Sequence, residues 1–143
     1  MIDWNLITSV PAVLALALVA RGFIPFSSRA GSEELRLFSL GMLWMIATFM
    51  LRTAYWGVVR STVLAIDPDL WRGWSEIVDG PDHVNALFNI GFMVGGFYIL
   101  RGFYVMIPAE ERHNWSVISA PFYPGGWCVR RLTRLLSQKW RQR

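Results

Sequence analysis

Long apolar runs dominate the sequence and set the expected fold. There are three of them, at residues 6–26, 37–59 and 84–107. Each run is about 20 residues or slightly longer, the length that an α-helix needs to cross roughly 30 Å of hydrocarbon. A soluble core built from so short a chain has no room for so much apolar helix surface. The pattern therefore predicts a domain of three transmembrane helices over residues 1–107.

The polar stretch between the second and third runs contains a shorter amphipathic pattern. Asp67 is a residue type that caps helices, and Pro68 suits the first helical position. The apolar residues that follow share one helical face: Leu70, Trp71, Trp74, Ile77 and Val78. Gly80, followed by proline, ends the pattern. We expect a short helix on the outer membrane surface, with Trp71 and Trp74 in contact with lipid. The alternative is a small helix packed on the spans.

The segment after the third run divides into two parts. Residues 108–126 contain several prolines and glycines, so we expect them to be irregular. Residues 128–143 have the spacing of a helix, with an apolar stripe of Val129, Leu132, Leu136 and Trp140. The residues expected to touch anionic lipid are Arg130, Arg131, Arg134, Lys139, Trp140, Arg141 and Arg143. The alternatives are a solvated topology anchor and a nucleic-acid contact, and the periodicity favours a surface over base readout.

Together these patterns predict an all-α integral membrane protein. It has three transmembrane helices, a short amphipathic helix in the outer loop and a basic amphipathic C-terminal helix. The composition agrees, because 54% of residues are hydrophobic and only 17% are charged, against about 25% charged residues in a soluble domain. We divide the chain into a transmembrane domain, residues 1–107, and a basic cytoplasmic tail, residues 108–143.

The distribution of Lys and Arg predicts the orientation. The segment before the first run has none, and the first loop has Arg21, Arg29 and Arg36. The second loop has only Arg60 and Arg72, whereas the tail is strongly basic. The positive-inside rule then places the first loop and the tail in the cytoplasm. We expect a multi-pass protein of the bacterial inner membrane with its N-terminus outside. The first run lacks a basic n-region, so we expect it to be retained as a span.

Residues that could carry catalysis or bind a metal are few and scattered. His83 and His113 fall on opposite sides of the predicted membrane, and Cys128 has no companion thiol. Asp79, Asp82 and His83 could touch a metal, but Asp82 suits the cap of the third span and the others suit a solvated turn. We therefore expect no catalytic residue, no metal, no cofactor and no small-molecule substrate, and we do not expect an enzyme.

Arg21, Arg52 and Arg101 lie inside or at the ends of the apolar runs. For Arg21 and Arg101 we favour side chains that reach the lipid headgroups, because both sit toward the predicted cytoplasmic face. Arg52 is deeper, with residues 53–59 still to cross and no acid within the spans. An intramembrane charge costs about 2.5–3.5 kcal/mol on insertion scales. Arg52 is therefore expected either to reach the headgroups or to face a water-lined surface in an oligomer.

Small residues on two of the runs predict close helix packing. Gly91 and Gly95 form a Gly-x-x-x-Gly element, with Gly96 beside it. The first run carries a face made of Ala12, Ala15, Val19 and Gly22. Such faces let helix backbones approach closely in lipid. Packing among the spans of one chain and self-association between chains are the two interpretations.

In topology and charge pattern the whole chain resembles the three-span holins of tailed bacteriophages. It shares three spans, an outside N-terminus and a basic cytoplasmic tail, but no residue motif. It departs from that class in its extra tail and outer helix, and in having no second Met before Met42. The resemblance implies a protein that oligomerises in the inner membrane and opens lesions through which an endolysin escapes. The helices would associate through Gly91, Gly95 and the small face of the first run, with Arg52 facing water.

The competing class is a small accessory or assembly subunit of a larger bacterial membrane complex. Such a subunit has a stoichiometric partner, and its expression is harmless. A small transporter or channel fits less well, because three spans do not give inverted repeats and the intramembrane charges are all arginines. The expected partners are a bilayer with anionic lipids and either further copies of the chain or a membrane complex, and not nucleic acid.

Overall fold

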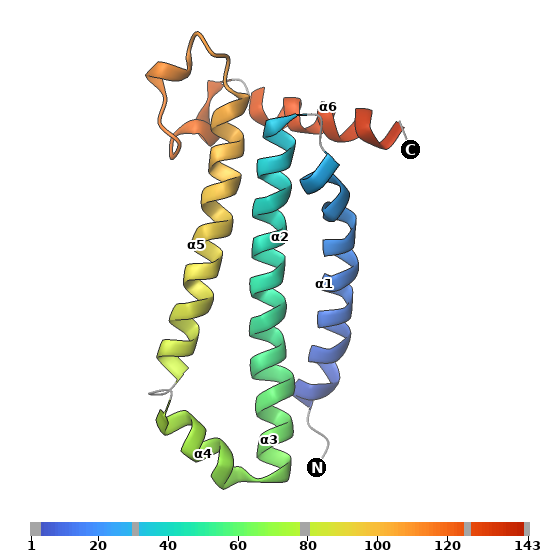
Figure 1. Cartoon of the computed structure of the whole chain (residues 1–143), viewed down its shortest axis with the longest axis vertical. Coiled ribbons are helices and arrows are strands. Elements are labelled where there is room, and N and C mark those ends of the chain that lie inside the picture. Colours follow the sequence, from blue (N-terminus) through green and yellow to red (C-terminus); the bar gives the residue numbers. More distant parts are fainter. Residues whose placement is uncertain (1–3, 30–31, 78–80, 125–126, 142–143) are drawn as a thin grey trace. The chain divides into compact units, whose positions relative to one another are not determined.

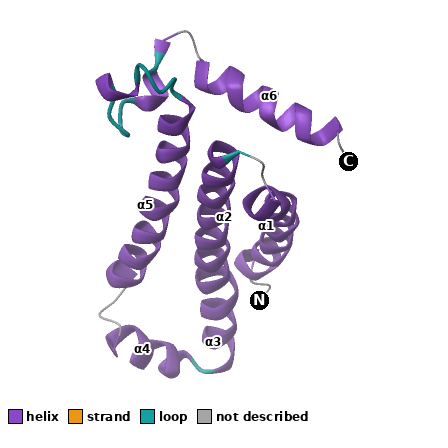
Figure 2. Cartoon of the chain, turned by 45° about the horizontal axis from the view of Figure 1, so that its top comes forward, coloured by secondary structure: helices purple, strands orange, loops and turns teal. Residues whose placement is uncertain are grey.

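The computed structural model describes residues 4–29, 32–77, 81–124 and 127–141. These residues form helices and turns, with no strand among them (Figures 1 and 2). The α-helices in the described part of the chain are α1 (Trp4–Arg29), α2 (Glu33–Thr53), α3 (Arg60–Ile66), α4 (Pro68–Ile77), α5 (Pro81–Met106) and α6 (Trp127–Arg141). A π-helix, η1 (Ala54–Val59), joins α2 to α3, and two short 3-10 helices, η2 (Arg112–Asn114) and η3 (Ala120–Phe122), lie between α5 and α6. The predicted all-α fold is confirmed.

Three helical stretches of the described residues are long and apolar enough to cross a membrane. They are Ile7–Ser27, Glu33–Ile66 and His83–Met106. The number of spans agrees with the three apolar runs, and the first and third stretches begin and end within a residue of the predicted ones. The chain is therefore compatible with a multi-pass membrane protein.

The second span is longer than its apolar run, which ends at Val59. The helix continues through η1 and α3 to Ile66, because no glycine or proline interrupts it between Gly57 and Pro68. It ends where Asp67 adopts an extended backbone, with φ −151° and ψ 100°, the conformation that a residue before proline favours. The stretch has 34 residues, which at about 1.5 Å per residue is longer than a hydrocarbon core requires. The hydropathy pattern did not predict this extension of the helix beyond Val59.

The start of α4 follows the expected capping chemistry. The backbone N–H groups of Asp69 and Leu70 donate to Oδ1 of Asp67, at 3.0 and 3.2 Å. Pro68 takes the first helical position. The prediction for the beginning of this helix is confirmed. By contrast, α5 begins at Pro81, so Asp82 lies inside its first turn and does not precede the helix as the expected cap.

The π-helix η1 changes the direction of the side chains that follow it. The backbone N–H of Arg60 donates to the carbonyl oxygen of Tyr55, five residues earlier rather than four. A π turn inserts one extra residue into a helix, so later side chains are rotated relative to an uninterrupted α-helix. Gly57 is buried within this segment. The rings of Tyr55 and Trp56 in this segment lie edge to face, with centroids 5.0 Å apart.

The described contacts divide the chain into two compact units. The first unit comprises residues 1–22 and 44–93, and the second comprises residues 23–43 and 94–143. Helices α1, α2 and α5 each contribute residues to both units. The predicted division at residue 107 follows the expected membrane boundary, whereas these units follow helix contacts.

In the first unit, aromatic side chains hold α4 against η1. The ring of Trp71 lies 6.0 Å from that of Tyr55 and 6.4 Å from that of Trp56, centroid to centroid. The indole Nε1–H of Trp74 donates to the Tyr55 hydroxyl at 3.0 Å. Phe88 of α5 joins the same cluster, with its ring 6.2 Å from that of Tyr55. Tyr55 is thus the common contact of three helical segments.

In the second unit, the chain after α5 folds back over the end of that helix. Met106, Ile107 and Ala120 are almost fully buried, and Leu132 of α6 packs against them. The Arg112 guanidinium donates from Nη2 to the carbonyl oxygens of Val105 and Ile107, at 2.9 and 3.0 Å. These carbonyls would otherwise lack partners at the helix C-terminus. The segment from 108 to 124 is irregular, as expected, but it is held by specific contacts.

Candidate packing, charge and lipid-facing sites

The Gly-x-x-x-Gly element of α5 is used within the chain. A Cβ atom added to Gly91 would lie 2.5 Å from Oγ1 and 2.8 Å from Cγ2 of Thr48, both in the first unit. In the second unit, the carbonyl oxygen of Gly95 would lie 2.7 Å from a Cβ added to Gly41 of α2. The missing side chains of Gly91 and Gly41 therefore permit close approach of α5 to α2, and the backbone of Gly95 lies at the second of these contacts. Of the two interpretations, packing within one chain describes Gly91 and Gly95.

Two further close-approach glycines have no counterpart among the sites expected from the sequence. A Cβ on Gly41 would meet Cγ1 of Ile99 at 2.6 Å, and one on Gly102 would meet the backbone N of Phe38 at 3.2 Å. Gly102 follows Gly95 by seven residues, which keeps it on the same face of α5. This spacing of seven residues is the sequence pattern that could have identified Gly102 as a close-approach glycine. No sequence pattern identifies Gly41 in the same way, because a single glycine in an apolar run has no periodicity.

Small polar residues accompany these glycines on α2. Ser39 and Thr48 are buried, with exposed fractions of 0% and 6%. The Thr48 hydroxyl donates to the carbonyl oxygen of Trp44 at 2.8 Å, so its polar atom is satisfied within its own helix. Small residues of this kind are typical of helix contacts in lipid, where they let backbones approach.

The small face of α1 remains uncovered. None of residues 7–25 is buried, and Ala15 and Gly22 are exposed while Ala12 is half-buried. A Cβ added to Gly22 would have nothing within 4 Å, and the same holds for Gly96 on α5. Apolar side chains of α1 are exposed as well, Leu18 to 70%. The small face of α1 and Gly96 are therefore open to lipid or to another chain.

The three arginines of the apolar runs are all exposed. Arg21 lies on α1, Arg52 in the last turn of α2 and Arg101 on α5. Arg52 lies two residues before the first residue of the π-helix, Ala54, so the deepest predicted charge is close to the irregular part of the second span. The choice between headgroup contact and a water-lined surface stays open for Arg52.

On α4 one part of the expected apolar face packs against η1, and the other part is exposed. Trp71 is half-buried against Tyr55 and Trp56, in agreement with the packed alternative. Leu70 and Ile77 are exposed to 61% and 80%. Trp74 combines the two, because it is 48% exposed and also hydrogen-bonds Tyr55. Lipid contact by α4 stays a prediction, carried best by Leu70 and Ile77.

The tail helix α6 has one attached face and one exposed face. Arg131 forms an ion pair with Glu34 at the start of α2, with Nη2 2.9 Å from Oε1. Arg130, Arg134 and Arg141 are exposed. The side chains of Lys139, Trp140 and Cys128, and the whole of Arg143, lie outside the described residues. Val78, Asp79 and Gly80 lie outside them too.

Metal-ligating side chains do not gather in the part of the chain that the structure describes. No group of three or more His, Cys, Asp or Glu residues there could hold a metal ion. His83 belongs to the first unit and His113 to the second. The expectation that the chain is no enzyme and takes no cofactor remains a prediction.

These features define the class of the protein as an all-helical chain with three helices able to span a membrane. Comparisons with protein-family models, with curated proteins and with solved structures gave no match.

Proposed function

We propose that the chain is a holin-like protein, which self-associates in the inner membrane of a bacterium and permeabilises it to release an endolysin. The observation that supports this best is the uncovered small face of α1. Ala15, Val19 and Gly22 are exposed on this face, and the open space around Gly22 leaves room for a second helix backbone. Close packing of this kind drives helix association in lipid.

The exposed arginines suit the same function. Arg52 lies within the second candidate span and is exposed in the isolated chain, where lipid would leave its charge poorly solvated. In an assembly the surface that carries Arg52 would line a wet lesion. The basic helix α6 adds affinity for anionic lipid, at about 1 kcal/mol for each charge near the surface.

A second candidate is an accessory subunit of a larger membrane complex. One observation favours it: within the chain, Gly91 faces Thr48, and the carbonyl oxygen of Gly95 faces Gly41. The Gly-x-x-x-Gly element is therefore not available for self-association, and the open face of α1 would instead receive a helix of the complex.

Expression in a bacterium separates the two candidates. If the chain is a holin, induced cultures should stop growing abruptly after a lag, because nucleated assembly depends on concentration. A co-expressed cytoplasmic endolysin should then lyse the cells, whereas neither protein alone should degrade the wall. Turbidity and release of a cytoplasmic enzyme measure both events. A protein that accumulates without permeabilising cells and co-purifies in fixed ratio with a membrane complex would replace the holin proposal with the subunit proposal.

The orientation is testable with reporter fusions. Alkaline phosphatase fused after Gly80 should be active, and the same enzyme fused after Arg143 should be inactive, because the basic first loop and tail are expected in the cytoplasm. A green fluorescent protein fused at the same two positions should give the inverse pattern. Active phosphatase at the C-terminus would reverse the proposed orientation.

A further inference from the structure

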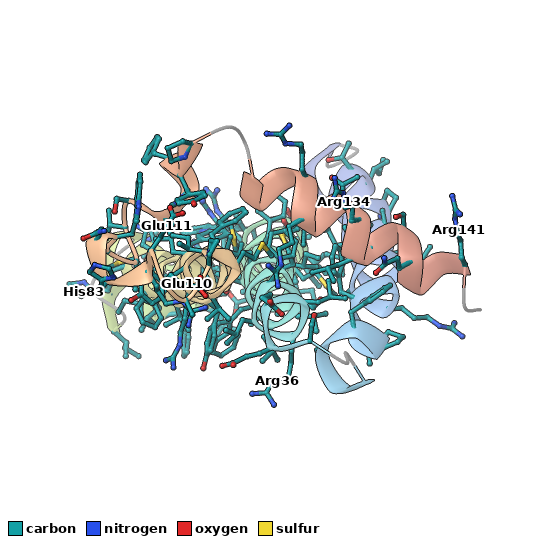
Figure 3. All side chains as sticks on the ribbon, turned by 90° about the horizontal axis from the view of Figure 1, so that it is seen from above. Arg36, His83, Glu110, Glu111, Arg134 and Arg141 are labelled. Carbon is teal, nitrogen blue, oxygen red and sulfur yellow. The ribbon has the colours of Figure 1, made fainter. Side chains whose placement is uncertain are left out.

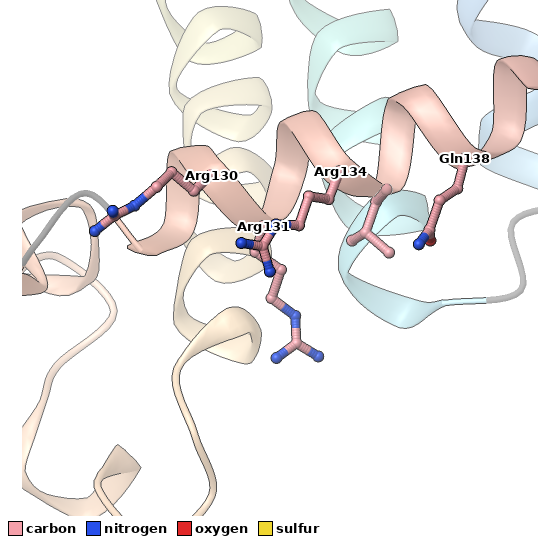
Figure 4. Close-up of a pocket in the computed structure, with 5 residues that line it drawn as sticks. Arg130, Arg131, Arg134 and Gln138 are labelled. Carbon is pink, nitrogen blue, oxygen red and sulfur yellow. The ribbon is translucent and has the colours of Figure 1, made fainter.

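The basic face of α6 forms an open groove of about 410 Å³. Its described lining consists of Arg130, Arg131, Arg134, Leu135 and Gln138, whose side chains project from one side of the helix (Figure 4). Their spacing of one, four, five and eight residues from Arg130 keeps them within one arc of a helix. No carboxylate is among these described lining residues. The groove therefore offers guanidinium and amide donors to an anion.

Arg131 links the groove to a second helix. The Arg131–Glu34 ion pair is partly sheltered, because the Glu34 side chain is only 13% exposed. Its two residues lie 97 positions apart in the sequence, so the pair fixes α6 to the start of α2. Arg130 and Arg134 keep their side chains exposed. Glu34 thus holds the helix in place and leaves the groove with a net positive charge.

The groove lies beside the end of a span within the second unit. Leu132, on the opposite face of α6, packs against the buried cluster of Met106, Ile107 and Ala120. The candidate span of α5 ends at Met106, so this packing holds α6 where the hydrocarbon of a bilayer would give way to headgroups. A ligand in the groove would therefore lie at the level of the lipid headgroups.

We propose that this groove binds the phosphate group of an anionic phospholipid. The planar guanidinium groups of Arg130 and Arg134 match phosphate oxygens with paired N–H donors. The Gln138 amide can donate to a neutral headgroup oxygen, and Leu135 offers an aliphatic contact next to the acyl chains. The inference rests on the membrane residence that the proposed function requires, but not on lesion formation. Lipid binding and cell lysis can therefore fail separately.

The test uses the full-length protein in micelles of a neutral detergent, titrated with fluorescent phosphatidylglycerol. The double variant Arg130→Gln with Arg134→Gln should bind about thirtyfold more weakly, which corresponds to about 2 kcal/mol or roughly 1 kcal/mol for each arginine. A matched control, Arg36→Gln with Arg72→Gln, removes the same charge from two exposed arginines that do not line the groove. Arg36 points away from α6 (Figure 3). This control should change the affinity by less than about threefold.

Further variants and competitors complete the test. Arg130→Lys with Arg134→Lys keeps the charge and should stay within about fivefold of the parent affinity, and circular dichroism should show unchanged helix content in every variant. An unchanged affinity in the glutamine pair, or an equal loss in the matched control, would overturn the groove as the site. Equal binding of phosphatidylcholine, or displacement by millimolar inorganic phosphate, would overturn an anionic lipid as its ligand.

Discussion

Replacing Gly41 with alanine is expected to destabilise the folded chain by about 1–3 kcal/mol. The new Cβ would lie 2.6 Å from Cγ1 of Ile99, 2.7 Å from the carbonyl oxygen of Gly95 and 2.9 Å from the backbone N of Ile99. Two of these three atoms belong to the backbone of α5, so no side-chain rotation can relieve the overlap and the helices must separate. Unfolding in mixed micelles with increasing dodecyl sulfate, followed by tryptophan fluorescence, measures the change.

Gly96→Ala is the matched control on α5. A Cβ at Gly96 would have nothing within 4 Å, and alanine is the better helix former by about 0.5–1 kcal/mol. The control should therefore leave the free energy of unfolding unchanged or raise it slightly. If Gly96→Ala lowered it as much as Gly41→Ala, the close approach of α2 and α5 would not be the cause.

Ala15→Leu combined with Gly22→Leu is expected to abolish the abrupt growth arrest or to delay it severalfold, while the chain itself stays folded. Both positions are exposed on the small face of α1, and Gly22 has open space around it. Leucine side chains there would hold a second helix away from the α1 backbone. The time of lysis with co-expressed endolysin measures the effect, and cross-linking in the membrane measures the oligomer.

Ala17→Leu provides the control for this second prediction. Ala17 is also exposed, but its position on the helix turns it to the other side of α1. It should leave both the lysis time and the cross-linked oligomer unchanged. Lysis at the normal time in the double variant would remove the small face from the mechanism. Leucine at Gly91 or Gly95 cannot make this distinction, because both glycines pack against α2 within the chain.

The helices themselves were predictable because their signals are local. An apolar run of sufficient length needs no partner to be recognised, and three such runs became three candidate spans. Asp67 and Pro68 marked the start of α4 through atoms only two or three residues away. The amphipathic spacing after residue 127 likewise marked α6. The exception was the end of the second span, which hydropathy placed at Val59 although nothing there breaks a helix.

The candidate sites were predictable only in part. The sequence identified Gly91 and Gly95 as close-approach residues, but it could not say whether they face α2 or another chain. It marked Trp71 and Trp74 as one apolar face, and both contact Tyr55. The π-helix that precedes this contact has no simple composition signal. The sequence pattern therefore could not predict the direction in which those rings point.

The sequence by itself determined the helical class, the number of candidate spans and the basic character of the tail, since each depends on composition and spacing within a few turns. The tertiary structure decided which faces are occupied. It placed Gly41 against Gly95 and Ile99, and it left the small face of α1 uncovered. It also joined Arg131 to Glu34 across 97 residues. Such pairings depend on distances between helices remote in the sequence, and a few ångströms decide whether a glycine is a contact or an open surface.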